Sequence, residues 1–290
     1  MNQKLLALYG LKYNPFGQEV PVEALRTTPR SDSFCWRIQN GHVREGGFAL
    51  VTGDPGTGKS AVMRLLAEQL SRLRDVTVGA VEHPQSNIAD FYRELGDLFS
   101  VQLRPHNRWA GFKTLRERWQ VHIDSTLLRP VLLIDEAQEM GPAVMTELRV
   151  LSSTRFDSRV ILTVVLAGDA RLLERLRREE LLPLGSRLRT RLMLEYATRE
   201  ELLDCLRHRL KAAGNPGLMT TELIATLVEH AAGNYRVLLN LASDLLVAAA
   251  EREQPQLDEK LYFEVFSPPG PPPEPSRPTR TQARASKRAR

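Results

Sequence analysis

Residues 53–60 read Gly-Asp-Pro-Gly-Thr-Gly-Lys-Ser, and this stretch constrains the fold more than any other part of the chain. It follows a short apolar run at 48–52 and precedes an amphipathic pattern of helical period at 60–73. A GxxxxGK[ST] motif between a strand and a helix lets backbone N–H groups surround phosphate oxygens, and the positive end of the helix adds to the attraction. The sequence therefore predicts a nucleoside triphosphate site on a strand–loop–helix unit.

The phosphate loop, defined here as residues 53–60, assigns roles to its individual side chains. We expect Lys59 to contact the β- and γ-phosphates of ATP, and the Ser60 hydroxyl to bind Mg²⁺. No role is predicted for position 61, which is Ala61. The expected nucleotide-binding residues are Gly53, Asp54, Pro55, Gly56, Thr57, Gly58, Lys59 and Ser60.

A second apolar run, at 131–134, ends in two adjacent carboxylates, Asp135 and Glu136. Beside a phosphate loop, the first acid can hold Mg²⁺ and the second can orient and polarise the attacking water. We therefore expect Asp135 to be a metal ligand together with Ser60, and Glu136 to act in catalysis. These patterns predict an ATPase that uses ATP with Mg²⁺.

The order of apolar runs predicts an α/β fold, a P-loop NTPase with a parallel sheet and helices on both faces. Strands are expected at 48–52, 76–81, 131–134, 160–167 and 187–194, and helices at 60–73, 87–99, 109–124 and 142–152. From the capping box at Thr198 onward the patterns are helical, at 220–232, 235–251 and 257–265. We expect an N-terminal segment (1–47), an ATPase core (48–196), a small all-helical lid domain (197–266) and a tail (267–290).

The tail accounts for the whole formal net charge of +5, because residues 267–290 hold six basic residues and a single acid. It is rich in proline and lacks apolar residues, so we expect it to be disordered. The two cysteines, Cys35 and Cys205, form no metal-binding or redox motif, as in a reducing compartment. No apolar stretch approaches the roughly 20 residues that span a bilayer, so we expect a cytoplasmic protein that does not bind a membrane itself and could be held at one only by a partner.

ATP hydrolysis also requires positive charge near the transferring phosphoryl group. Residues 184–191 read Leu-Gly-Ser-Arg-Leu-Arg-Thr-Arg, and Arg187 is the favoured catalytic arginine, donated to a neighbouring subunit. Arg189 and Arg191 stay open as alternatives, and so does a merely solvated basic strand. Arg236 could contact the γ-phosphate or pair with a nearby acid, and Asp169 fits either a polar sensor or a helix cap.

The ordered motifs GDPGTGKS, LLIDEAQ, LAGD-x-RLLERL, SRLRTRL and GNYRVLLNL resemble those of the ExeA/TnsC/MuB-type group of AAA+ ATPases. The opening YGLKYNPF is similar to a phrase with which members of this group often begin. The resemblance covers roughly residues 5–265 and implies a transposition-associated ATPase. Such a protein assembles with itself on double-stranded DNA as a ring or filament, selects target DNA and activates a transposase.

The resemblance also implies roles for single residues. Arg187 matches the finger arginine and Arg236 the second sensor. Asp169 occupies the first sensor position, where relatives often have Gln or Asn. Three residues near the N-terminus, by resemblance only, border the adenine: Asn14, Pro15 and Phe16.

Residues 101–120 are the segment that could support DNA binding independently, since basic residues there exceed acids by four. A basic surface of this kind can follow a phosphate backbone without reading sequence. A helix with its aromatic residues in the core and its arginines in water explains the pattern equally well. The alternative function is an assembly or secretion-associated ATPase that acts on protein complexes without DNA. The residues concerned are Arg104, Arg108, Lys113, Arg116 and Arg118, with Trp109, Phe112 and Trp119 interleaved.

Overall fold

The computed structural model describes residues 3–103 and 107–266. The tail at 267–290, expected to be disordered, and Arg104, an expected DNA contact, lie outside these residues. The centre of the fold is a five-stranded sheet in the order β2-β3-β6-β1-β7, with every neighbouring pair parallel. The strands are β1 (Gly47–Gly53), β2 (Val78–Val81), β3 (Val131–Ile134), β6 (Thr163–Gly168) and β7 (Leu188–Leu194).

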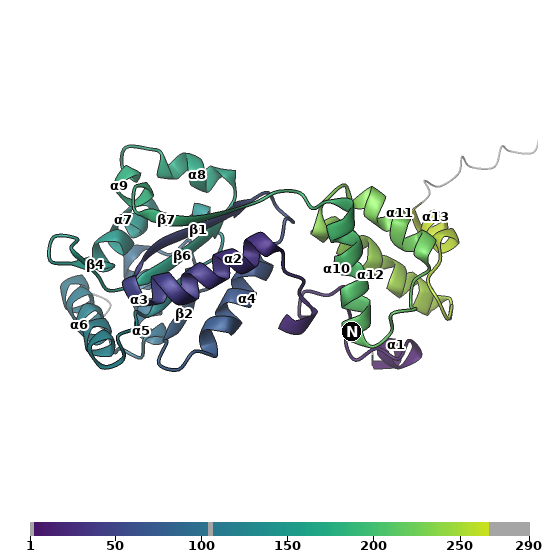
Figure 1. The fold of residues 1–290 in the computed structure, drawn as a ribbon, viewed down its shortest axis with the longest axis horizontal. Helices are drawn as coiled ribbons and strands as arrows, with labels where there is room; N and C mark the ends of the chain where they lie inside the picture. The colour runs from purple at the N-terminus through teal and green to yellow at the C-terminus, as the bar shows by residue number, and fades with distance from the viewer. Residues whose placement is uncertain (1–2, 104–106, 267–290) are drawn as a thin grey trace, which may run out of the picture.

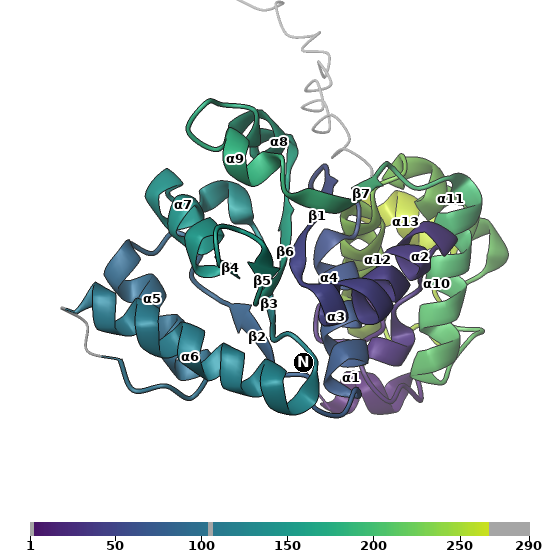
Figure 2. The ribbon, with the colours of Figure 1, turned by 60° about the vertical axis from the view of Figure 1, so that its left-hand side comes forward.

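Helices cover both faces of this sheet, as predicted, because successive strand side chains point to opposite faces. Phe48, Leu50 and Leu132 belong to one buried cluster, whereas Ala49 and Val51 belong to another. Figure 2 shows α5, α6 and α7 on one side of the strands and α2 and α4 on the other. Their bounds are α2 (Pro29–Arg37), α4 (Lys59–Ser71), α5 (Ile88–Leu98), α6 (Arg108–Thr126) and α7 (Pro142–Leu151).

The strand predicted at 160–167 differs from the structure at its start. Val160 belongs to β5 (Arg159–Val160), which pairs antiparallel with β4 (Ser153–Thr154) and forms a hairpin beside the main sheet. The sheet strand β6 begins only at Thr163, and Ile161 and Leu162 between them are buried. The apolar run continues through both elements, so periodicity alone could not separate them.

Two short helices follow β6 and lead into the edge strand β7. They are α8 (Ala170–Leu176), capped by Asp169, and α9 (Leu182–Gly185). The register of β7 sets Leu188 beside Phe48 and Leu194 beside Gly53. The phosphate loop follows the carboxyl ends of the strands, and the start of β7 therefore lies at the other end of the sheet.

The C-terminal part is helical and forms a separate group beside the α/β part (Figure 1). The Thr198 hydroxyl accepts from the Glu201 N–H, and the Glu201 carboxylate accepts from the Thr198 N–H, which is the predicted capping box. Apolar stripes at helical spacing then bury a core of their own. The helices are α10 (Arg199–Ala213), α11 (Thr221–Ala231), α12 (Tyr235–Glu251) and α13 (Glu259–Phe266).

The N-terminal residues contact both parts. Helix α1 (Gln3–Leu8) leads into Tyr9, Leu11 and Phe16, which are buried in the core of the C-terminal helices. Residues 22–45 instead form η1 (Val22–Ala24), α2, η2 (Ile38–His42) and α3 (Val43–Glu45), and α2 packs against the sheet. Within the part of the chain that the structure describes, no helix has the length and apolar character to cross a bilayer.

Candidate nucleotide-binding site

The phosphate loop connects β1 to α4 and is closed by its own side chains. Lys59 is buried, and its Nζ donates to the carbonyl oxygens of Gly53 at 2.9 Å and Asp54 at 3.2 Å. The Thr57 hydroxyl donates to the Asp54 oxygen at 2.8 Å. Gly58 precedes helix α4 in the left-handed region, with φ of 101°. The loop therefore surrounds a space at the N-terminus of a 13-residue helix, where an anion is favoured.

Gly56 shows that this loop has no room for a side chain. Its φ is 86°, and a Cβ there would approach the Asn234 Oδ1 to 2.1 Å. Both the positive φ and the close approach require glycine. Glycine at this position therefore allows the loop to pack against the start of α12.

The two carboxylates of the predicted acidic pair follow β3 directly. The Asp135 Oδ1 accepts from the Glu136 N–H at 2.9 Å, and Glu136 has φ of 50°, in the left-handed region. Its carboxylate accepts a hydrogen bond from the buried Gln138 amide. The Gln138 Oε1 in turn accepts from the Asp169 N–H at 3.3 Å. Gln138 therefore joins Glu136 to the end of β6.

A cavity of about 570 Å³ lies between the phosphate loop and the C-terminal helices, a size suited to a nucleotide. Glu136 and Asp169 line it from the sheet, and Tyr235 and Arg236 line it from α12. Of the expected nucleotide-site residues that the structure describes, those that do not line the cavity are Asn14, Pro15, Gly53, Asp54, Asp135, Arg187, Arg189 and Arg191.

Phe16 is the one of the three proposed adenine neighbours that lines the cavity, and it is buried. Arg209 of α10 fixes its surroundings, because its guanidinium donates to the oxygens of Pro15 at 3.0 Å and Gly17 at 3.4 Å. Burial lowers the pKa of Arg209. The N-terminal segment is thereby tied to α10 at the cavity wall.

Asp169 begins helix α8 as its cap, accepting from the Arg171 N–H at 2.9 Å, and it also lines the cavity. Its other oxygen pairs with the Arg171 guanidinium, at 2.8 Å from Nη2. Glu139 contacts the same guanidinium at 2.9 Å. The two interpretations of Asp169 are therefore compatible in space, since the cap lies at the sensor position.

The start of α12 touches the phosphate loop directly. The Asn234 Nδ2 donates to the Pro55 oxygen at 3.0 Å, and the Tyr235 N–H donates to the Gly56 oxygen at 3.1 Å. Arg236, the next residue, is exposed and faces the cavity. A movement of the C-terminal helices would therefore act on the loop and on Arg236 together.

The basic segment at 101–120 is mostly engaged within the protein. Arg108 pairs with the buried Glu147, and Lys113 pairs with Glu117 at 3.7 Å. Arg116 donates to the Ser153 oxygen at 2.8 Å and lies over the Phe112 ring. Trp119 is a core residue, whereas Trp109 is exposed and stacks on Phe112. Contacts within the protein, the alternative to DNA binding, thus account for Trp119 and for these three cations.

Comparison with known proteins adds to this geometry. Residues 42–176 match the family model for an AAA domain. The chain has the AAA+ P-loop fold. Two solved AAA+ structures are similar. Cdc6p from Pyrobaculum aerophilum is 18% identical with a TM-score of 0.67, covering 84% of this chain and 67% of that one. The Aeropyrum pernix ORC1 protein, solved with DNA, is 18% identical with a TM-score of 0.59, covering 84% and 66%.

Among curated proteins, the General secretion pathway protein A of Aeromonas hydrophila is 29% identical to this chain over 245 residues. The match covers 83% of this chain and 44% of that protein, so the chain spans less than half of its relative's length. The expected AAA+ P-loop fold is confirmed. The narrower expectation, a transposition-associated ATPase, is not confirmed by these comparisons and stays a prediction.

Four residues of the candidate nucleotide site are not predicted by the sequence analysis: Gln138, Arg171, Arg209 and Asn234. Asn234 carries a local signal, since a Gly-Asn pair before a helical pattern is typical of an N-cap. Gln138 follows Glu136 within the same motif. Arg209 carries no such signal, because its role depends on contacts with residues 15–17, far away in the sequence.

Proposed function

We propose that this chain hydrolyses ATP as an assembly of identical subunits, each active site being completed by Arg187 of a neighbour. The observation that carries the proposal is the register of β7, which starts beside Phe48 and ends beside Gly53. Because a strand rises about 3.3 Å per residue, Arg187 lies roughly 20 Å along the strand direction from the end of the sheet that holds its own phosphate loop. An arginine side chain is too short for that distance, so Arg187 is available only to another copy.

Within one subunit, the phosphate loop and the acidic pair supply the remaining chemistry. Lys59 leaves the oxygens of Gly53 and Asp54 and contacts the β- and γ-phosphates of ATP. Glu136 orients a water in line with the γ-phosphorus and accepts its proton. The water oxygen bonds to the γ-phosphorus as the bond from the γ-phosphorus to the bridging oxygen breaks, which gives ADP and phosphate. Mg²⁺, held by Ser60 and Asp135, would neutralise charge on the phosphate oxygens.

Two further contacts connect this chemistry to the rest of the subunit. The Gln138 amide nitrogen donates to the Glu136 carboxylate, and the Gln138 oxygen accepts from the Asp169 N–H just after β6. Arg236 lies at the start of α12, beside the two contacts that this helix makes with the loop. We propose that Arg236 contacts the γ-phosphate, so that hydrolysis releases the C-terminal helices from the phosphate loop.

For the partner, we propose double-stranded DNA, with selection of target DNA for a transposase as the biological task. The motif order supports both parts of this proposal, and the neighbours in fold that were solved with DNA support only the DNA partner. Counterion release would make such binding strongly dependent on salt. Since Arg108 pairs with Glu147 and Arg116 donates to the Ser153 oxygen, we expect contacts to come mainly from other basic residues, among them those at 277–290.

The second candidate is an ATPase that acts on protein complexes without DNA. Its support is the relative named for a general secretion pathway. Both candidates share the proposed ATPase site and the contribution of Arg187, and they differ only in what the assembly binds.

Steady-state ATP hydrolysis with and without non-specific duplex DNA separates the two, measured at about 50 and 200 mM salt, where phosphate contacts weaken strongly. Stimulation by DNA that fades at the higher salt is the expected result. A rate of hydrolysis that is the same with and without DNA at both salt concentrations contradicts the DNA proposal and favours a protein partner. Absence of hydrolysis under all conditions contradicts the ATPase itself.

A further inference from the structure

The hairpin β4–β5 ends in a strained and exposed tip. Its residues Arg155, Phe156 and Asp157 have φ of 51°, 57° and 66°, so three successive residues other than glycine occupy the left-handed region. This conformation is costly for a residue as bulky as phenylalanine, and such strain persists only where the surroundings enforce it. The Phe156 side chain is fully exposed. Among the described residues, none buries this phenylalanine.

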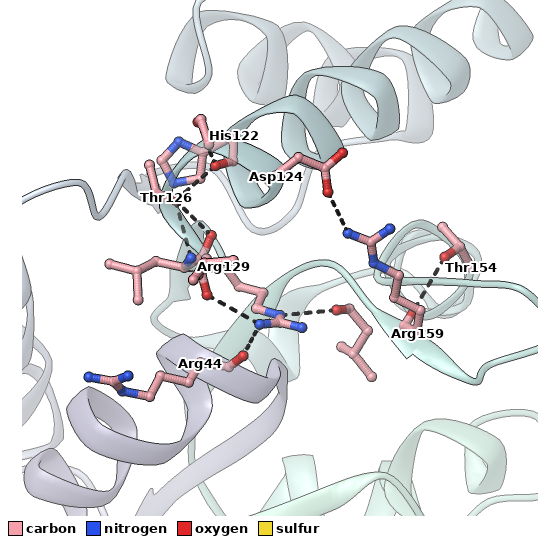
Figure 3. A network of polar contacts seen from close by, with 11 residues as sticks. Arg44, His122, Asp124, Thr126, Arg129, Thr154 and Arg159 are labelled. Atoms are coloured by element: carbon pink, nitrogen blue, oxygen red, sulfur yellow. Dashed lines mark hydrogen bonds and ion pairs between the residues drawn. The ribbon is translucent and has the colours of Figure 1, made fainter.

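The base of the hairpin is fixed by a polar network (Figure 3). Arg159 pairs with Asp124 of α6 at 2.8 Å. The Arg129 guanidinium donates to the Val160 oxygen at 3.3 Å and to the Arg44 oxygen of α3. Arg116 adds a hydrogen bond to the oxygen of Ser153. The hairpin is thus anchored on α6 and α3, and its tip is presented from a rigid base.

The tip also holds Arg187. The Asp157 carboxylate pairs with the Arg187 guanidinium, which donates on its other side to the Pro183 oxygen of α9. The Ser153 hydroxyl donates to the other Asp157 oxygen. The Ser153 hydrogen bond, followed by Arg187, lowers the pKa of Asp157 below its usual value, so the carboxylate is charged at neutral pH.

Exposed apolar side chains flank both anchors of this arginine. Phe156 precedes Asp157, and Leu182, which is 55% exposed, precedes Pro183. Arginine is enriched among the residues that dominate protein–protein binding, and an exposed aromatic ring beside it can serve as an anchor. In Figure 1 the loop at β4 lies at the end of the α/β part remote from the C-terminal helices. This surface therefore faces away from the subunit's own nucleotide cavity.

We propose that Phe156 and Leu182 dock a second copy of this chain beside its nucleotide cavity, and that Asp157 holds Arg187 until docking transfers it to the neighbour's γ-phosphate. This rests on the proposed function, which needs Arg187 in trans. The charges are complementary, because the Arg187 guanidinium would exchange the single negative charge of Asp157 for the larger negative charge of the ATP bound by the neighbour. A head-to-tail contact of this kind repeats from copy to copy and builds a ring or a helical filament.

Replacing Phe156 tests the docking surface. Phe156→Ser should raise the protein concentration for half-maximal ATP hydrolysis at least about tenfold, the effect of losing an aromatic anchor. Thermal stability and single-subunit nucleotide affinity should be unchanged, since the side chain is fully exposed. Phe263→Ser on α13, another exposed phenylalanine, is the matched control and should behave as wild type. Unchanged assembly of Phe156→Ser, or loss of DNA retention with normal assembly, overturns the proposal.

Replacing Asp157 tests the hold on Arg187. Asp157→Asn keeps an acceptor for Ser153 but removes the negative charge. It should raise hydrolysis at saturating protein by about two- to fivefold, the range expected for a partly exposed ion pair. Asp244→Asn, at an exposed acid of α12, is the control. A rate below wild type contradicts the proposal, because Asp157 would then position Arg187 rather than retain it.

Failure of this inference can be told from failure of the proposed function by Arg187→Ala. If Arg187→Ala is inactive while Phe156→Ser assembles normally, only the docking surface is wrong. If Arg187→Ala hydrolyses ATP like wild type, the proposed contribution in trans is wrong as well.

Discussion

The Asn234 Nδ2 donates a hydrogen bond to the Pro55 carbonyl oxygen at 3.0 Å, across the boundary between the C-terminal helices and the phosphate loop. The Oδ1 of the same side chain accepts from the N–H groups of Arg236 at 2.9 Å and Val237 at 3.2 Å. One residue therefore begins α12 and ties it to the loop. The position of this helix and the shape of the loop are coupled through Asn234.

Asn234→Ala removes both contacts. Loss of the N-cap should cost about 1 kcal/mol. For a chain of this size that lowers the melting temperature by roughly 2–4 °C. Loss of the hydrogen bond to the loop should weaken ATP binding by about two- to tenfold. Asn234→Ser still caps the helix but has no amide donor, so it should restore the melting temperature and not the affinity. Wild-type affinity in both variants would show that the contact has no part in binding.

Substitutions in the phosphate loop and in the acidic pair should affect nucleotide binding and ATP hydrolysis separately. Lys59→Ala should lose nucleotide binding, because the loop then offers no cation to the β- and γ-phosphates. Glu136→Gln should bind ATP normally and hydrolyse it at least about 100-fold more slowly. Nucleotide titration and single-turnover hydrolysis measure the two effects. Glu117→Gln, an exposed glutamate of α6, is the control. Full turnover by Glu136→Gln would refute its role.

Gln138 should act as a positioning residue for Glu136. Gln138→Met keeps the volume of the buried side chain but loses its hydrogen bonds to the Glu136 carboxylate and the Asp169 N–H. The free energy of a hydrogen bond to a charged group corresponds to a factor of about ten to 100 in a rate constant, so the rate of hydrolysis should fall by that factor. ATP affinity should stay within about twofold, which titration checks. An equal loss of binding and hydrolysis would mean that the substitution merely disturbs the fold.

Stability should depend on pH through His42, which is buried against β7 and hydrogen-bonded to the Thr190 hydroxyl at 2.9 Å. Burial and then the charge of Arg189 lower the His42 pKa to about 4, against a smaller opposite effect of Glu45. Between this value and the ordinary value of about 6.5, the unfolded chain binds the proton more readily than the folded one. The stabilisation is therefore complete above about pH 6.5 and is lost as the pH falls toward 4.

The lowered pKa corresponds to about 3 kcal/mol at most. Chemical denaturation of wild type and His42→Gln at several pH values between about 4 and 7 measures it. The difference in unfolding free energy between the two proteins should shrink as the pH falls. A difference that stays constant would show that His42 does not titrate as this environment requires.

The parts of the fold that follow from local pattern were predictable from the sequence. The apolar run before Gly53 and the helical period after Ser60 fix a strand and a helix, and the same holds for the run that ends at Asp135. The parallel sheet with helices on both faces then follows from their alternation. The start of β6 was predicted too early, because Val160 is apolar but pairs with Ser153 in the hairpin.

Contacts between residues distant in sequence were not predictable. The pair of Asp157 with Arg187 spans 30 positions, and that of Asn234 with Pro55 spans 179. Nothing local distinguishes Trp119, which is buried, from Trp109, which is exposed in the same helix. Likewise the charge of Arg108 is visible in the sequence, whereas its pairing with Glu147 depends on how α6 packs on α7.

The central claim, that Arg187 completes the site of a neighbour, is tested most directly by mixing two inactive variants. Arg187→Ala keeps its own site but offers no arginine, and Glu136→Gln binds ATP and offers Arg187 but cannot activate water. Each alone should be almost inactive. In an equal mixture, roughly a quarter of head-to-tail contacts combine an intact site with an intact arginine, and hydrolysis should return to about that fraction of wild type. A co-assembled mixture no more active than its components would contradict the account.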